Sequence, residues 1–291
     1  TQIHLGNVMK KAGYVTGIVG KWQLQGGFEG PNKFGFDDYC LWQLTRRPCR
    51  YPNTGLEING KTVDYRNGEY GPDLVSDHLV NFIRKNKDGD KPFFAYYPMI
   101  LPHWPFQPTP DSDDWDPAET KEWKRSKWNR KHFSDMVTYA DKMVGKIDKA
   151  LADMGIREQT LLIFTCDNGT YTGITSPFQG KQLKGGKGST PNAGTHVPFI
   201  ASWPGTIKPG QVSDDLIDFS DVLPTLAELG GATFGLRFPG GDVDVHLGKI
   251  NASHVESESR QPEAVPSYAA GCVQQARTRS VSLFLQQLDQ H

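Results

Sequence analysis

Hydrophobic positions along the chain follow two different spacings. Short apolar runs typical of buried strands occur at residues 15–19, 92–100, 160–165 and 197–203. Several segments between these runs instead repeat their apolar residues every three or four positions, which is the period of an amphipathic helix. Strands that alternate with helices in this way predict an α/β protein.

The strongest helix prediction covers residues 130–154. Its apolar side chains form one stripe, which consists of Met136, Ala140, Met143, Val144, Ile147 and Leu151. Two further helices are predicted over 74–86 and over 219–229, the second despite Pro224 in its interior. The first residues of the chain, TQIHLGNVMKKAGY, also resemble the middle of a helix. We therefore expect a fragment whose N-terminus lies further upstream.

Other segments lack a regular period. Residues 105–117, PFQPTPDSDDWDP, contain too many prolines and acidic residues for regular structure, and they predict a surface loop. We expect residues 26–70 and 105–125 to form loops that shape the rim of a pocket. Residues 239–291 have weak periodicity, and we assign no structure to them. They form a divergent or truncated C-terminal region after a domain that covers residues 1–238.

Composition and charge narrow the classes of function. The chain is 37% hydrophobic and 22% charged, as a globular protein is. Lys and Arg total 32 against 33 Asp and Glu, so no net positive field favours nucleic acid or a membrane surface. No apolar stretch reaches the roughly 18 residues of a membrane helix, and residues 1–25 lack a signal-peptide pattern. Any anion that this protein binds must therefore be recognised by a local site.

The four cysteines do not indicate a metal site or a disulfide framework. They are Cys40, Cys49, Cys166 and Cys272. None has C-x-x-C spacing, and four are too few to build a disulfide scaffold of this size. We expect most of them to be buried thiols.

Polar residues follow the predicted strands at the points where ligands collect in open α/β sheets. Lys21, His103 and the pair Asp167 and Asn168 stand there, as does the loop around Lys187. Carboxylate and amide oxygens suit Ca²⁺ or Mg²⁺, and a cation would compensate a buried carboxylate. Asp-Asn-Gly is also good turn chemistry, so a metal site and a plain turn both remain open.

The other three side chains also have two interpretations each. His103 lies in LPHWP, a rigid segment that could hold an imidazole as an acid or hydrogen-bond donor, or simply pack it against Trp104. Lys187 lies in the flexible GGKG loop, which could wrap an anion, and Lys21 follows Gly20. Isolated lysines are, however, usually solvated surface charges. Taken together, the set suggests a divalent metal and cationic side chains around a small anion, without an evident nucleophile.

Several segments resemble the sulfatases, specifically the arylsulfatase branch of the alkaline-phosphatase-like superfamily. They are AGYVTGIVGKWQL at 12–24, PFFAYYPMILPHWPFQPTP at 92–110, MVTYADKMVGKIDKAL at 136–151, TLLIFTCDNG at 160–169 and LKGGKGSTPNAGTHVPFIASWPG at 183–205. They occur in the family's order across roughly residues 5–235. The resemblance implies an α/β/α sandwich around a mostly parallel central sheet, with an incomplete catalytic domain over 1–238 that lacks its N-terminal part.

The resemblance also implies roles for single residues. Asp167 and Asn168 resemble the C-terminal half of the family's Ca²⁺ site. Lys21 and Lys187 resemble the lysines that contact the sulfate, and His103 resembles the histidine near the ester oxygen. These three are the expected catalytic residues, and both lysines are also expected to bind substrate.

Two positions depart from the family pattern. Sulfatases carry an upstream Cys-x-Pro-Ser-Arg or Ser-x-Pro-Ser-Arg segment whose first residue becomes formylglycine, the nucleophile. None of the four cysteines lies in such a segment, so the formylglycine is expected in a missing N-terminal part. Gln23 stands where the family often has histidine. Its amide can bind sulfate by hydrogen bonds but cannot shuttle protons.

The resulting expectation is a Ca²⁺-dependent hydrolase of sulfate monoesters of an aryl or carbohydrate alcohol, inactive as this fragment alone. Two alternatives are a phosphate or phosphonate monoester hydrolase of the same superfamily and a non-catalytic protein that binds sulfated glycans. The resemblance favours export to a periplasmic, extracellular or lysosomal space.

Overall fold

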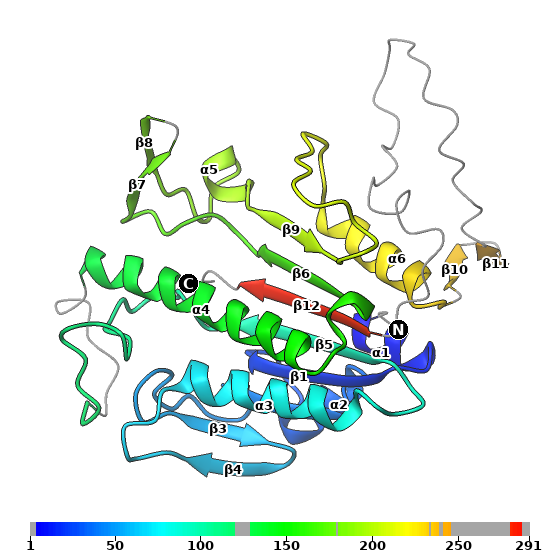
Figure 1. The fold of residues 1–291 in the computed structure, drawn as a ribbon, viewed down its shortest axis with the longest axis horizontal. Coiled ribbons are helices and arrows are strands. Elements are labelled where there is room, and N and C mark those ends of the chain that lie inside the picture. The colour runs from blue at the N-terminus through cyan, green and yellow to red at the C-terminus, as the bar shows by residue number, and fades with distance from the viewer. Residues whose placement is uncertain are drawn as a thin grey trace.

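An eight-stranded sheet forms the centre of the computed structural model (Figure 1). The structure describes residues 4–119, 129–178 and 180–232, together with the backbone of three strands at 234–238, 241–245 and 280–286. The spatial order of the sheet is β4 (Lys61–Asp64), β3 (Gly55–Ile58), β2 (Asp38–Trp42), β1 (Val15–Lys21), β5 (Phe93–Met99), β12 (Ser280–Gln286), β6 (Thr160–Cys166) and β9 (Phe199–Ser202).

The five central strands of this sheet are parallel. β2, β1, β5, β12 and β6 pair in parallel, whereas β3, β4 and β9 add antiparallel pairs at the two edges. The mostly parallel sheet is thus confirmed. Because parallel strands point the same way, the segments that follow β1, β5 and β6 all leave the sheet at one edge.

Helices cover both faces of the sheet. α3 (Gly71–Asn86) contacts α4 (Arg130–Asp153) and strands β1, β2 and β5 on one face. α1 (Leu5–Lys11) contacts β1 and also α6 (Phe219–Leu229) on the other face. Short helical turns complete the set: η1 (Gly27–Glu29), α2 (Gly30–Lys33), η2 (Arg157–Gln159) and α5 (Asn192–Thr195). The three predicted internal helices are confirmed as α3, α4 and α6.

Two hydrophobic clusters occupy the two faces, and successive strand residues alternate between them. In β5, Phe93 and Ala95 join the cluster with α3 and α4, whereas Phe94 joins the cluster with α1 and α6. In β6, Leu162 and Ile163 divide in the same way. Both faces are covered, so these strands are mostly apolar and appear in the sequence as nearly continuous runs.

Residues 26–70 were expected to form loops, but the structure has strands there. This region contributes strands β2, β3 and β4 to the sheet. β3 and β4 are joined by Asn59 and Gly60, which have positive φ angles of 46° and 83°. Asn-Gly between two short strands is a strong hairpin signal, because both turn residues must adopt φ above zero. The hairpin was therefore detectable in the sequence.

The segment 105–117 has no helix or strand, as expected, but its first half is not on the surface. Residues 105–109 are buried. Phe106 is 1% exposed, and its ring packs edge-on against Phe133 and Tyr171. Pro105 and Pro108 carry no backbone N–H, which reduces the number of donors that must be paired on burial.

Several strands lie where no structure was assigned or expected. β10 (Phe234–Phe238) and β11 (Gly241–Val245) form an antiparallel pair, and β12 lies between β5 and β6 in the central sheet. The sequence of β12, SVSLFLQ, is a seven-residue apolar pattern within a polar region, too short to be recognised by period alone. The proposed division at residue 238 stays a prediction.

The hairpin of β7 (Thr175–Phe178) and β8 (Lys181–Lys184) was also not expected. Cys40 and Cys166 are buried and Cys49 is half-buried, while Cys272 lies outside the described residues. Within the described part of the chain, no helix has the length and apolar character needed to cross a membrane.

Truncation of the α4 stripe tests the packing of this face. Ile147 is fully buried between α4 and the sheet. Ile147→Ala should lower the free energy of unfolding by about 2 to 5 kcal/mol, because it removes buried methyl groups and leaves a cavity. Lys149→Ala, on a side chain that is 73% exposed, should change it by less than about 0.5 kcal/mol. Urea unfolding of both variants measures the difference, and equal values would contradict the described packing.

Candidate functional site

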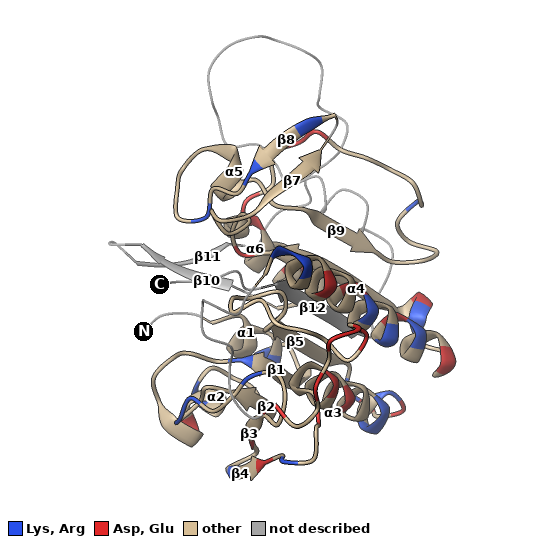
Figure 2. Ribbon diagram, turned by 90° about the vertical axis from the view of Figure 1, so that its left-hand side faces the viewer, with Lys and Arg blue, Asp and Glu red and all other residues tan. Residues whose placement is uncertain are grey.

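Three strands deliver the candidate residues to one edge of the sheet. Lys21 is the last residue of β1, His103 follows β5, and Asp167 directly follows β6. Along α3 and α4, Lys and Arg positions are interspersed with Asp and Glu positions (Figure 2).

Lys21 is held away from water although it carries a charged side chain. It is only 5% exposed. Gly20 before it has a φ of 114°, and a Cβ there would lie 2.1 Å from the carbonyl oxygen of Pro98, so only glycine lets β1 approach β5 this closely. Burial, together with the nearby Arg50, lowers the pKa of Lys21 to about 8, although Asp167 acts in the opposite direction.

The turn after β6 packs against the glycine-rich loop. The backbone N–H of Gly169 donates to the carbonyl oxygen of Gly194 at 2.8 Å, and that of Lys187 donates to Thr170 at 3.0 Å. A Cβ on Gly169 would lie 2.0 Å from the carbonyl oxygen of Ala193, so a side chain cannot be accommodated there. The loop thus folds back over the end of β6 and brings Lys187 close to Asp167.

Two buried polar atoms in this region lack hydrogen-bond partners among the described residues. They are Nζ of Lys187 and Oδ1 of Asn168. Burial lowers the pKa of Lys187 to about 8, with Lys21 acting in the same direction and Asp167 against it. Buried ammonium and carbonyl groups are costly without partners. The first suits an anionic ligand, and the second suits a cation.

His103 is buried beside an arginine that the sequence analysis did not identify. Nη1 of Arg50 lies 2.6 Å from Nδ1 of His103 and donates to the carbonyl oxygen of Trp104 at 2.9 Å. Arg50 has no solvent exposure, and its guanidinium lies over the ring of Trp42 at 4.6 Å from the ring centroid. Tyr51 adds a hydrogen bond from its hydroxyl to the carbonyl oxygen of His103 at 2.7 Å.

The charge state of His103 follows from these neighbours. Burial lowers its pKa to about 2, with further lowering by the positive charges of Arg50, Lys21 and Lys187. The nearby carbonyl oxygen of Trp104 acts in the opposite direction but does not offset them. His103 is therefore a neutral imidazole at physiological pH.

The structure thus brings most of the predicted residues together. Lys21, His103, Asp167 and Lys187 lie close enough for their charges to shift one another's pKa values, and Asn168 adjoins Asp167. Lys187 follows β8 of the separate hairpin rather than a strand of the central sheet.

Gln23 differs from the other predicted residues. Its side chain is exposed, its φ angle is 51°, and its backbone N–H donates to the carbonyl oxygen of Gln43 at 3.3 Å. Arg50 was missed because nothing around it in the sequence is periodic. A fully buried arginine becomes apparent only once its partners are placed.

The cation-binding potential of this edge rests on Asp167 and Asn168. Among the residues that the structure describes, no group of three or more His, Cys, Asp and Glu side chains is arranged to hold a metal ion. Ca²⁺ takes six to eight oxygen ligands. The carboxylate of Asp167 and the buried Oδ1 of Asn168 fit such an ion as one part of its coordination shell.

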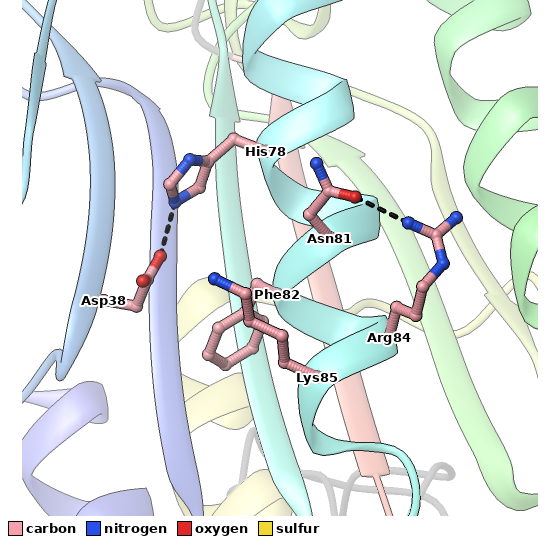
Figure 3. Close-up of a pocket in the computed structure, with 6 residues that line it drawn as sticks. All are labelled: Asp38, His78, Asn81, Phe82, Arg84 and Lys85. Carbon is pink, nitrogen blue, oxygen red and sulfur yellow. Dashed lines mark hydrogen bonds and ion pairs between the residues drawn. The ribbon is translucent and has the colours of Figure 1, made fainter.

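A separate pocket of about 250 Å³ lies near the opposite edge of the sheet. It is lined by Asp38, His78, Asn81, Phe82, Arg84 and Lys85 (Figure 3). Asp38 is the first residue of β2, whereas Lys21 is the last of the parallel strand β1. Polar groups of this pocket pair with each other, His78 with Asp38 and Arg84 with Asn81. None of the predicted site residues lines it.

Comparison with known proteins shows that this chain is similar to sulfatases. Arylsulfatase A of Homo sapiens is 30% identical over 264 residues, which cover 79% of this chain and 48% of the relative. The N-acetylgalactosamine-6-sulfatase of Canis lupus familiaris is 31% identical over 247 residues, with 78% and 44% covered. The chain thus spans about half the length of the curated relatives it matches.

Solved structures agree with this result. Ps i-CgsB is 29% identical with a TM-score of 0.64 over 79% of this chain and 53% of its own. The PsFucS1 sulfatase of Pseudoalteromonas sp. has a TM-score of 0.60 at 24% identity, with 79% and 50% covered. These likenesses confirm the alkaline-phosphatase-like α/β sandwich. Because the family profile described as Sulfatase matches residues 1–232 as well, the chain belongs to the sulfatase family.

Proposed function

We propose that this chain forms the sulfate-binding part of a sulfuric ester hydrolase. The observation that carries the proposal is the buried ammonium of Lys187, which has no hydrogen-bond partner among the described residues and adjoins the region of Lys21. A sulfate monoester presents negatively charged oxygens that accept hydrogen bonds from such groups. Hydrogen bonds between charged partners are shorter and stronger than neutral ones.

The proposal gives each of the site residues a task. Lys21 and Lys187 stabilise the negative charge on the sulfuryl oxygens, an effect that grows in a site that excludes water. His103, neutral and buried, donates a hydrogen bond toward the ester oxygen as the bond to sulfur breaks. Gln23 is proposed to bind substrate, although its side chain is exposed in this structure.

A cation and a nucleophile complete the proposed enzyme. Asp167 and Asn168 would contribute two oxygen ligands to Ca²⁺ or Mg²⁺, and the ion supplies Lewis-acid stabilisation of negative charge when bound. The nucleophile is proposed to be a formylglycine in a part of the protein outside these 291 residues. The 291-residue chain by itself is then expected to bind sulfate without turning over esters.

The names of two relatives support a proposed substrate class. One is named for N-acetylgalactosamine-6-sulfate, and the crystal structure of Ps i-CgsB with k-i-k-neocarrahexaose, 28% identical to this chain, contains a carbohydrate. We propose sulfate monoesters of carbohydrate or aryl alcohols. Turnover of an aryl sulfate and an aryl phosphate by the longer protein tests this proposal. Preference for the phosphate, or binding without turnover, would contradict it.

Removal of the Lys187 ammonium tests its role in anion binding. Lys187→Met keeps most of the side-chain length but removes the charge. Sulfate binding to the 291-residue chain should weaken by about 10- to 100-fold, the usual value of a hydrogen bond to a charged group. Lys184→Met, at an exposed position of β8, should leave it unchanged. Isothermal titration calorimetry measures both, and equal losses in the two variants would exclude a specific role.

The lowered pKa values of the two lysines predict a pH dependence. Each lysine is charged below its pKa of about 8 and neutral above it. Sulfate affinity should therefore fall as the pH rises from about 7 to about 9, by roughly tenfold for each lysine that must be charged. His103 stays neutral over this range and does not contribute to the dependence.

The titration is best made on metal-free protein, so that only side chains contribute. In Lys187→Met the dependence on pH should become shallower, because only Lys21 remains to titrate. Lysines with ordinary pKa values near 10.4 would keep the affinity constant over this range. A constant affinity would therefore show that the buried lysines do not hold the anion.

A further inference from the structure

The backbone and side chain of Arg50 are fixed by contacts on several sides. Its carbonyl oxygen lies against the start of α3, where a Cβ on Gly71 would come within 2.3 Å of it. Its guanidinium lies over Trp42, whose own Nε1 donates to the carbonyl oxygen of Pro48 at 3.0 Å. The Nη1 end of the side chain reaches His103. A fully buried side chain with these contacts has little freedom to move.

The contact of Arg50 with His103 determines which ring nitrogen carries the proton. An arginine has only donor groups, so the Nδ1 atom that lies 2.6 Å from Nη1 must accept a hydrogen bond. A neutral imidazole with an accepting Nδ1 carries its proton on Nε2. The two hydrogens of Nη1 can serve the two acceptors that surround it, Nδ1 of His103 and the carbonyl oxygen of Trp104.

The opposite tautomer is disfavoured by the same contacts. Nδ1 is also close to the carbonyl oxygen of Trp104, which could accept a proton from it. That arrangement would direct an N–H of the ring at an N–H of Arg50 across 2.6 Å. The carbonyl oxygen of Trp104 already accepts from Arg50, so it does not require the ring proton.

We propose that Arg50 is a positioning residue that holds His103 as the neutral tautomer protonated on Nε2. The inference rests on the proposed function, for which it defines what His103 can do. Held in this way, the ring donates through Nε2–H to an ester oxygen. It cannot act as a base through that nitrogen.

The wild-type chain allows a direct test. Long-range ¹H–¹⁵N spectra of the ¹⁵N-histidine-labelled 291-residue protein distinguish protonated from unprotonated ring nitrogens, and the His103 signal is the one lost in His103→Gln. We expect an unprotonated Nδ1 and a protonated Nε2, unchanged between about pH 5 and pH 8 where ordinary histidines titrate. A proton on Nδ1, or titration in this range, would overturn the proposal.

Two variants separate positioning from general support of the fold. Arg50→Met should allow His103 to sample both tautomers and raise its pKa, because the donor and the positive charge are lost. Arg46→Met is the matched control in the same segment, since Arg46 pairs instead with Asp64 of β4. Its His103 spectrum should match that of the wild type. If Arg50→Met does not fold, the wild-type spectrum still decides the question.

The longer protein gives a kinetic readout. Arg50→Met should lower kcat by about 100-fold, the cost expected when a catalytic group is misplaced, with little change in KM. An unchanged kcat would contradict the positioning role. The spectrum needs no substrate, metal or turnover, so it can succeed if the proposed function fails. Conversely, an active enzyme with the wrong tautomer would overturn only the inference about Arg50.

Discussion

The burial of positive charge at one edge of the sheet is the constraint on which this site depends. Lys21, Arg50 and Lys187 share that edge with the carboxylate of Asp167. A lysine pKa near 8 instead of 10.5 means that burial disfavours the charged form of Lys21 relative to water. The proposed sulfate would offset this effect, because its negative charge favours the ammonium form of each lysine.

The fold places these charges where flexible segments could not. Parallel strands buried on both faces bring the segments after β1, β5 and β6 to a common edge, although they are separated by up to 146 positions between Lys21 and Asp167. Gly20 and Gly169 let backbones approach within distances that any side chain would prevent. Rigid packing of this kind keeps buried charges from turning outward to water.

Features that arise within a single element could be predicted from the sequence, whereas features that depend on distant residues could not. β1, β5 and α4 were predictable because their apolar periods arise within the element itself. The same holds for Lys21, Asp167 and Asn168, which directly follow apolar runs. β2, β3 and β4 were missed because they are only four or five residues long, although Asn59 and Gly60 mark the turn between β3 and β4.

The remaining features have causes that are distant in the sequence. Arg50 is buried because Trp42, His103 and Trp104 surround it, and none of them lies in its own local pattern. Phe106 is buried for a similar reason, since its partners belong to α4 and to the turn after β6. Arginines and proline-rich loops usually lie at the surface. Only the tertiary contacts show that Arg50 and Phe106 are buried.

The position of Arg50 also changes how the segment between β2 and β3 contributes to function. We expected residues 26–70 to shape only the rim of a pocket, yet this segment supplies the guanidinium that contacts His103. A change in the backbone there would therefore move the imidazole of His103. Because β2 pairs directly with β1, the same segment is tied to Lys21 through the sheet. The orientation of His103 and the position of Lys21 are therefore mechanically linked.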